Sequence, residues 1–345
     1  MKRMFLLGLV TLLIVVATPP GFTQTLGEWT SLTSLPSPRS ECAAVLIDTT
    51  VYIVGGSEFS SGTSYPVLRT GILPDGTLSG WVEEICRPLE IRSDSIIFAN
   101  AGYLYAISGR NGPYLDRSTT IERAKINTEG SIGEWEYFGY CPSPGFWAST
   151  WLQTSTDLYV FGGYPGTCEI WRLPLYSNGS IGTFSRLSSD YNIARYGTGV
   201  ILVGDRLFIQ GGASVYGPGD VHYTETASLL SDGTIGEWTI LTKSTFIHRT
   251  HMLAKVGNYL YTIAGVLPGE DIRGAESAPF LTDSTLGEWS MGAPHPHERI
   301  QFAHLQTDKG LYVFGGWGNH DLDGVEFAPI IYSTDVKSRQ WKGYN

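Results

Sequence analysis

The sequence predicts an all-β fold, a six-bladed β-propeller with four antiparallel strands in each blade. Two short sequence motifs, which we call phrases, predict this fold, because both recur along the chain with the same period. One phrase ends in an aromatic residue, as in SDGTIGEW (231–238), and the other ends in glycine, as in LYVFGG (158–163). The aromatic residues lie 52, 54, 49, 54, 51 and 52 residues apart, and about fifty residues is enough for one four-stranded blade. These residues are Trp29, Trp81, Trp135, Phe184, Trp238, Trp289 and Trp341.

Each repeat divides into four short strands, a to d. Strand a follows a segment that contains proline or arginine, as in SPRSECAAVLI, and strand c follows a loop of variable length. Strand d carries the aromatic residue. Strand b is the apolar run that ends in glycine, and we expect its six copies at 51–55, 104–108, 158–162, 207–211, 260–264 and 311–315.

The phrase before each aromatic residue has the chemistry of a tight hairpin. Asp232-Gly233 and Asn178-Gly179 are dipeptides that tolerate positive φ, and we expect them to join strand c to strand d. The aromatic residue then offers a large apolar face for packing between adjacent sheets. We therefore expect four tryptophans to be buried between blades: Trp81, Trp135, Trp238 and Trp289.

The sequence does not determine which end of the chain closes the ring. Seven aromatic phrases compete for six outer strands, so either the N-terminal TLGEW (25–29) or the C-terminal SRQW (338–341) is surplus.

Composition agrees with short strands and restricts the possible partners. The 345 residues include 42 Gly, 19 Tyr and 10 Trp, and only 16% are charged, with a formal net charge of −10. An acidic chain is a poor match for nucleic acid, whose phosphates need clustered Lys and Arg, or for an anionic membrane. We expect a monomer.

The N-terminal segment has the features of a secretory signal. Lys2 and Arg3 precede an apolar run over residues 4–17, which is short for a bilayer span. We expect a signal peptide over 1–24, with cleavage after Ala17 or Thr23, and a single propeller domain over 25–345. The mature protein would then be secreted or periplasmic and free of the membrane. An uncleaved anchor is the alternative.

The repeat resembles the kelch family over residues 25–345. The YVFGG-type double glycine, the tryptophan downstream and the LPSPRS or HPHER segment all look like the kelch pattern. Two copies depart from it, because Ser108-Gly109 and Ala264-Gly265 break the double glycine, and the DGTIGEW phrase is longer and more regular than the usual kelch ending. The resemblance implies a propeller whose functional face carries the d-to-a and b-to-c loops, with strand a along the central channel.

An arginine recurs just before strand a in five repeats, and the third repeat has GFWAST instead. Two interpretations remain open. The guanidinium groups could tie blades together through backbone carbonyls, or they could form a cationic ring for a carboxylated or polyhydroxylated ligand. These residues are Arg39, Arg92, Arg195, Arg249 and Arg299.

Other candidate ligand-binding residues fall on the same predicted face. We expect His251 and His297 to make polar contacts, and Trp147 and Trp317 to stack on a ligand. Four carboxylates near the predicted mouth, paired with the histidines of that face, are weaker candidates for acid–base chemistry: Glu41, Asp94, Asp220 and Asp321. No HExxH or similar spacing is present, so we expect neither a metal nor a cofactor.

Four cysteines would meet an oxidising compartment after export. Of the three possible pairings we expect Cys42–Cys86 and Cys141–Cys168, because all four residues fall near the predicted loop face.

The function favoured by the sequence is binding of a glycan or a protein through the loop face. The predicted c-to-d turns are nearly constant in length, whereas the b-to-c segments vary, and variable loops on a rigid scaffold commonly carry binding. The alternative is a sugar-active enzyme, because the kelch resemblance also includes sialic-acid mutarotases or epimerases and, with less support here, copper oxidases.

Overall fold

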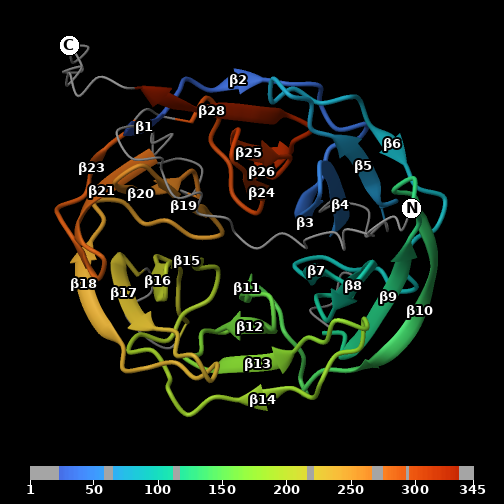
Figure 1. Cartoon of the computed structure of the whole chain (residues 1–345), viewed down its shortest axis with the longest axis horizontal. Helices are drawn as coiled ribbons and strands as arrows, with labels where there is room; N and C mark the ends of the chain where they lie inside the picture. Colours follow the sequence, from blue (N-terminus) through green and yellow to red (C-terminus); the bar gives the residue numbers. More distant parts are fainter. Residues whose placement is uncertain are drawn as a thin grey trace, which may run out of the picture.

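The computed structural model describes residues 23–57, 65–111, 117–215, 221–265, 275–292 and 295–333. These residues form six antiparallel sheets of four or five strands arranged around one centre (Figure 1), together with one two-stranded sheet, which confirms the six-bladed propeller. Blade 1 contains β3 (Ser40–Ile47), β4 (Thr50–Ser57), β5 (Leu68–Gly71) and β6 (Val82–Glu83). Blade 2 contains β7 (Ile96–Asn100), β8 (Tyr103–Ile107), β9 (Thr120–Ile126) and β10 (Ile132–Tyr140). Blade 3 contains β11 (Thr150–Gln153), β12 (Asp157–Phe161), β13 (Ile170–Pro174) and β14 (Ser185–Arg186).

The second half of the ring follows the same order. Blade 4 contains β15 (Gly199–Val203), β16 (Arg206–Gln210), β17 (Tyr223–Ser228) and β18 (Thr239–Lys243). Blade 5 contains β19 (Met252–Val256), β20 (Tyr259–Ile263), β21 (Ala275–Thr282), β22 (Thr285–Leu286) and β23 (Ser290–Met291). Blade 6 contains β24 (Ala303–Gln306), β25 (Gly310–Phe314) and β28 (Val325–Ser333) with two N-terminal strands, β1 (Thr23–Leu26) and β2 (Thr30–Ser31). Each predicted strand b is present and begins one residue before its predicted start.

The N-terminus closes the ring. β1 pairs with β28 from Thr23 opposite Ser333, and β2 pairs with β28 at Thr30 opposite Phe327. The N-terminal phrase therefore supplies the outer strands of blade 6, while Trp341 lies outside the described residues. The propeller also begins two residues earlier than predicted, since Thr23 and Gln24 belong to β1 rather than to the segment before it.

The repeated tryptophans pack between blades. Trp135, Trp238 and Trp289 are buried, as predicted. Trp135 lies in an apolar layer with Val54 of blade 1. Trp81 is only half-buried, because its indole Nε1 reaches the surface to donate a 3.0 Å hydrogen bond to the Thr33 carbonyl.

The hairpin phrase also joins one blade to the next. Gly233 adopts φ 80° in the c-to-d turn of blade 4, and its carbonyl accepts a 3.0 Å hydrogen bond from the Tyr159 hydroxyl of blade 3. The tyrosine is the second residue of the LYVFGG phrase. Three other blade pairs repeat this contact, namely Tyr52 to Gly130, Tyr105 to Gly179, and Tyr312 to Gly76. The two phrases thus share a period because each contacts the other across a blade boundary.

The two predicted disulfides are absent, and all four cysteines are free thiols. Each lies in a different apolar layer between blades, so no pair is brought together. Cys42 packs between blades 6 and 1, Cys86 between blades 1 and 2, Cys141 between blades 2 and 3, and Cys168 between blades 3 and 4. Within the described ranges there is no helix of the length and apolarity that crossing a membrane requires.

Candidate functional site at the channel mouth

A ring of left-handed residues surrounds one end of the central channel. One residue of each blade, at or just before the start of strand a, has φ between 48° and 62°. Backbone hydrogen bonds link neighbours around this ring, such as Asp94 N to Glu41 O at 2.9 Å and Gly197 N to Ala148 O at 2.9 Å. The ring consists of Glu41, Asp94, Ala148, Gly197, Thr250 and Gln301.

This ring fixes the alignment of the six repeats and corrects two assignments. Counting two residues back from each left-handed position gives Arg39, Arg92, Phe146, Arg195, His248 and Arg299. The fifth member is therefore His248 and not Arg249, and the ring position of blade 5 is Thr250 and not His251. The segment HRTH (248–251) can be aligned with the other repeats in two ways. The choice depends on which residue adopts the left-handed backbone conformation, and the sequence alone does not show this.

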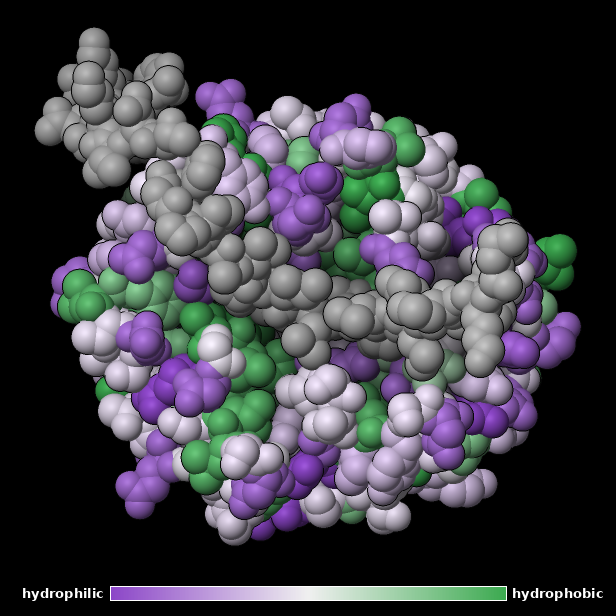
Figure 2. All heavy atoms as spheres, viewed as in Figure 1, coloured by the Kyte–Doolittle hydropathy of each residue, from purple (hydrophilic) through white to green (hydrophobic). Residues whose placement is uncertain are grey.

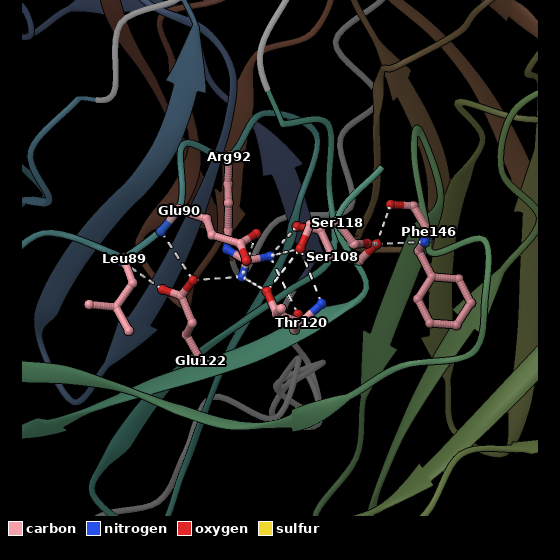
Figure 3. Close-up of polar contacts among 8 residues, drawn as sticks. All are labelled: Leu89, Glu90, Arg92, Ser108, Ser118, Thr120, Glu122 and Phe146. Carbon is pink, nitrogen blue, oxygen red and sulfur yellow. Dashed lines mark hydrogen bonds and ion pairs between the residues drawn. The ribbon is translucent and has the colours of Figure 1, made fainter. Parts of the chain in front are cut away.

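The arginine of blade 2 is part of the interior of its blade (Figure 3). Arg92 Nη1 donates to the Ser108 carbonyl at 2.6 Å, and Nη2 donates to Glu122 Oε1 at 2.7 Å. The Glu122 carboxylate also accepts hydrogen bonds from the backbone N–H groups of Leu89 and Glu90, at 2.8 and 3.1 Å. The arginine and glutamate together tie the d-to-a loop to strand c of the same blade.

The same pairing recurs in three other blades. Its partners are Arg195 with Glu225, His248 with Glu276, and Arg299 with Glu326. Blade 3 has an aromatic pair instead, Phe146 against Trp171, with ring centroids 6.3 Å apart.

A cationic ring for a ligand is not formed. Arg39, Arg92, Arg195 and Arg299 are 0–2% exposed and are occupied by the protein's own acceptors. This burial supports a scaffold role for these four arginines, but the tie is made inside a blade and not between adjacent blades as expected. Arg249 differs, because it is half-buried on the mouth side, one residue before the ring.

The other predicted site residues are dispersed. His251 is 2% exposed and packs against blade 4, close to Gly199 and Gly211. His297 is exposed, with its Nε2 3.6 Å from Glu326 Oε1. Trp317 begins β26 (Trp317–Gly318), which pairs with β27 (His320–Asp321), and its backbone pairs with Ile300. β26 lies across the ring from blade 3, which follows Trp147 (Figure 1).

Polar side chains from three blades meet at the mouth. Glu41 is buried, and its Oε2 lies 2.6 Å from Nη2 of Arg110. Its Oε1 accepts a 3.0 Å hydrogen bond from Nε2 of Gln301. The Glu41 carboxylate is thus held by donors from blades 2 and 6.

Aromatic rings continue this cluster over blades 3 and 4. Trp147 Nε1 donates to Asp94 Oδ2 at 3.0 Å. The Trp147 ring lies 4.5 Å from Tyr164, which in turn lies 5.4 Å from Tyr196. The guanidinium of Arg117 lies 5.7 Å from the Trp147 ring, within range for a cation–π contact. We call Glu41, Asp94, Arg110, Arg117, Trp147, Tyr164 and Tyr196 the mouth cluster.

The two carboxyl groups of the mouth cluster differ in environment. Burial, and next the neighbouring Glu41, raise the pKa of Asp94 well above its usual range, while the hydrogen bond from Trp147 and the charge of Arg110 lower it in part. Glu41 instead has a guanidinium partner. A carboxyl group with a raised pKa and an ion pair therefore lie side by side. The predicted candidate Asp220 lies outside the described residues.

Sequence reasoning missed Arg110 and Arg117. A signal existed, because the b-to-c segment of blade 2, RNGPYLDR, carries two arginines, more than any other such segment. Among the residues that the structure describes, no three His, Cys, Asp or Glu side chains are grouped in a way that could hold a metal ion.

Comparison with known proteins supports the fold. No protein-family model matches the chain, and no curated protein matches it either. A solved structure titled "Structure of YjhT" superimposes with a TM-score of 0.67 at 12% sequence identity, covering 88% of this chain and 99% of that one. The chain has the architecture of a kelch-like six-bladed β-propeller. In that fold it resembles YjhT.

Proposed function

We propose that this propeller binds a carbohydrate at the channel mouth. The observation that carries the proposal is the mouth cluster, where ionised and aromatic side chains of four blades converge on one rim. Carboxylate and guanidinium groups match the hydroxyl groups of a sugar as acceptors and donors. The faces of Trp147 and Tyr164 offer apolar area for the C–H side of a sugar ring.

A compact polar ligand suits the geometry better than a protein surface. The two Glu41 contacts come from blades 2 and 6, so the polar groups face a narrow opening rather than a broad plane. The large apolar residues exposed elsewhere belong to different blades, such as Ile85 just after β6 and Leu281 in β21, and Figure 2 shows several separate hydrophobic areas on the face that it draws. Protein interfaces of standard size need a contiguous area of about 800 Å² on each partner.

The test is a glycan array probed with the purified protein, followed by calorimetric titration of the strongest binder. Trp147→Ala and Arg110→Gln should each weaken binding by about fivefold or more, because a stacked ring or a charged donor is worth about 1–3 kcal/mol. Trp317→Ala is the matched control, since it removes the same side chain on blade 6 and should leave affinity unchanged. Equal affinity in the wild type, W147A and R110Q would exclude the mouth cluster as the site.

A sugar-active enzyme is the second candidate, favoured by the raised pKa of Asp94 beside Glu41. A carboxyl group that holds its proton to higher pH can donate it to a sugar oxygen while a neighbouring carboxylate accepts one. Interconversion of the anomers of a bound reducing sugar, followed by NMR, should then be faster with the wild type than with D94N. Binding without any acceleration would leave the binding role alone.

A further inference from the structure

The mouth opens into a cavity that continues down the central channel. The cavity has a volume of about 250 Å³. Its upper end is lined by Glu41, Asp94 and the rest of the left-handed ring, and its lower end by Leu46, Gln153 and Gln306. The mouth cluster therefore stands at the top of a shaft rather than on a closed floor.

The wall of the shaft is largely apolar and reachable from the lumen. Ala44, Leu46, Trp151, Val200 and Leu305 line the cavity from the innermost strands, and all five are only half-buried although they lie at the centre of the molecule. Side chains at this position keep such exposure only where open space adjoins them.

The indole or amide N–H groups of three wall residues are turned away towards neighbouring blades. The indole Nε1 of Trp151 donates to the Ile97 carbonyl at 3.1 Å. Gln153 Nε2 donates to the Ala99 carbonyl at 2.7 Å, and Gln306 Nε2 donates to the Lys255 carbonyl at 2.6 Å. What faces the lumen is therefore mostly hydrocarbon and aromatic surface.

The two histidines of the shaft have lowered pKa values. Burial, and next the nearby His248 and His304 rings, lower the pKa of His251 well below its ordinary value. His304 is exposed to the lumen, and desolvation inside the ring lowers the pKa of its imidazole to about 4. Below the charged mouth, the lumen is bordered mainly by hydrocarbon and aromatic side chains, with the imidazole of His304 among them.

We propose that the ligand of the mouth carries a short apolar arm, an alkyl, acyl or aryl group attached to the sugar, and that this arm enters the shaft. This inference rests on the proposed function and narrows its ligand class to amphiphilic glycosides or acylated sugars. Whole small-molecule pockets measure roughly 300–1,000 Å³, so a cavity of about 250 Å³ suits one group of a ligand better than a complete ligand.

The gain in affinity should grow with the length of the arm. Each methylene moved from water into an apolar compartment strengthens binding about fourfold. The probes are methyl and hexyl β-glycosides of glucose, galactose, mannose and N-acetylglucosamine, titrated by calorimetry into the wild-type protein. For the sugar that is recognised, the hexyl glycoside should bind at least tenfold more tightly than the methyl glycoside.

Filling the shaft with a larger side chain should remove the extra affinity for the hexyl glycoside and leave the affinity for the methyl glycoside unchanged. Val200→Phe places a larger side chain at the lumen, and Leu305→Trp is a second plug if the first fails to fold. Either folded variant should bind the methyl glycoside as the wild type does and should lose the extra affinity for the hexyl glycoside. Val82→Phe, on the exposed outer strand of blade 1, is the matched control and should keep the gain.

The outcomes separate the two proposals. Equal affinity for methyl and hexyl glycosides, or an unchanged gain in a folded plug variant, overturns the apolar arm and leaves carbohydrate binding intact. If no glycoside binds and the glycan array is blank, the proposed function fails. 1-Hexanol, followed by saturation-transfer NMR, then decides the shaft alone. Contact with the wild type but not with V200F supports an apolar compartment, and no contact with either overturns it.

Discussion

At the scale of single residues, the position two residues before the left-handed ring carries different side chains that make the same contact in four blades. His248 lies where three other blades pair an arginine with glutamate. Its Nδ1 is 2.8 Å from the Ala264 carbonyl, and its Nε2 is 3.1 Å from a Glu276 carboxylate oxygen. Hydrogen bonds to His248 and to backbone N–H groups lower the pKa of Glu276 despite its burial, so both ring nitrogens face acceptors. The imidazole of His248 therefore reaches the same two kinds of acceptor, a backbone carbonyl and a glutamate carboxylate, as the guanidinium groups of the other blades.

Removing this histidine should destabilise the protein more than replacing it by the residue of the other blades. His248→Ala leaves the buried Glu276 carboxylate without its side-chain partner and should lower the free energy of unfolding by about 1–3 kcal/mol. His248→Arg restores donors towards the same acceptors and should cost less. Urea unfolding compares these proteins, with His297→Ala, at an exposed position in blade 6, as the control. An equal loss in H248A and H248R would argue against a shared role of histidine and arginine at this position.

A second histidine should make the fold sensitive to acid. His295 is fully buried, and burial, followed by the charge of Arg299, lowers its pKa to about 3, whereas an unfolded histidine titrates near 6.5. Between these values the unfolded chain binds more protons than the folded one. Stability therefore falls as pH drops from about 6.5 towards 3, by up to about 1.4 kcal/mol per pH unit.

His295→Gln removes that titration. The loss of unfolding free energy between pH 7.5 and pH 5 should be smaller in H295Q than in the wild type by about 2 kcal/mol, whatever the variant's absolute stability. Urea titrations at both pH values provide the comparison, with H297Q as control. An identical pH dependence in the wild type and H295Q would show that the pKa of His295 is the same in the folded and unfolded states.

The site was only partly predictable from single residues. Trp147 is recognisable because GFWAST departs from the arginine pattern of the other repeats, and the structure places it in the mouth cluster. Arg110 contributes through its contact with Glu41, 69 residues away. That contact depends on how blades 1 and 2 pack against each other, and no short sequence pattern predicts this packing. The recurring arginines were predicted as candidate ligand-binding residues because a charge that recurs in five repeats can form a ring. The glutamates on strand c that pair with three of them could not be recognised from the sequence.

At the scale of elements, the repeated phrases were the most predictable part of the chain. The six strands b were placed to within one residue at their starts because an apolar run and a glycine define each of them. The outer strands vary more, from two residues in β14 to nine in β10, because their length depends on contacts with the neighbouring blade. Blade 4 shows one such adjustment. Phe208 occupies the tyrosine position there and packs edge-on against Phe280 of blade 5, with ring centroids 5.4 Å apart.

The tyrosine hydroxyls that join blades should contribute measurably to stability. Tyr159→Phe removes the hydrogen bond to the Gly233 carbonyl and keeps the packing of the ring. It should lower the free energy of unfolding by about 0.5–1.5 kcal/mol. Thermal and urea unfolding measure the change. Tyr259→Phe, at an exposed tyrosine of blade 5, should change stability by less than about 0.5 kcal/mol; an equal effect at the two positions would argue against the inter-blade contact.

At the scale of the whole molecule, the ring is closed by joining the two ends of the chain. β28 accepts β1 and β2 as its outer neighbours, so blade 6 combines residues about 300 positions apart. A further contact extends this closure to blade 5, because Gln24 Oε1 accepts a 3.1 Å hydrogen bond from the Gly257 N–H. The sequence left the closure open because both terminal phrases end in tryptophan. Pairing with β28 shows that the N-terminal phrase closes the ring. The sequence does not show this pairing, because it forms only when the two ends of the chain meet in the assembled ring.

This closure restricts where an export signal could be removed. Cleavage after Thr23 would delete the residue that pairs with Ser333, whereas cleavage after Ala17 keeps β1 whole. If the chain is exported as we propose, mass spectrometry of the mature protein should find an N-terminus upstream of Thr23. A mature chain that starts at Gln24 and has full stability would show that this end of β1 is dispensable.

Deleting the two ends of the chain should have opposite consequences. Removal of residues 1–31 takes away β1 and β2, exposes the outer edge of β28 and uncovers the apolar layer that contains Leu26 and Trp29. An open ring with an unpaired strand edge is prone to aggregation, so this variant should unfold at a much lower temperature or fail to remain soluble. Removal of 334–345 takes away Trp341 and should leave the melting temperature within about 2 °C of the wild type, because β1 and β2 already occupy the outer positions of blade 6. Thermal unfolding of both truncated proteins decides between the two closures: a stable N-terminal deletion together with an unstable C-terminal deletion would mean that SRQW, and not TLGEW, completes the ring.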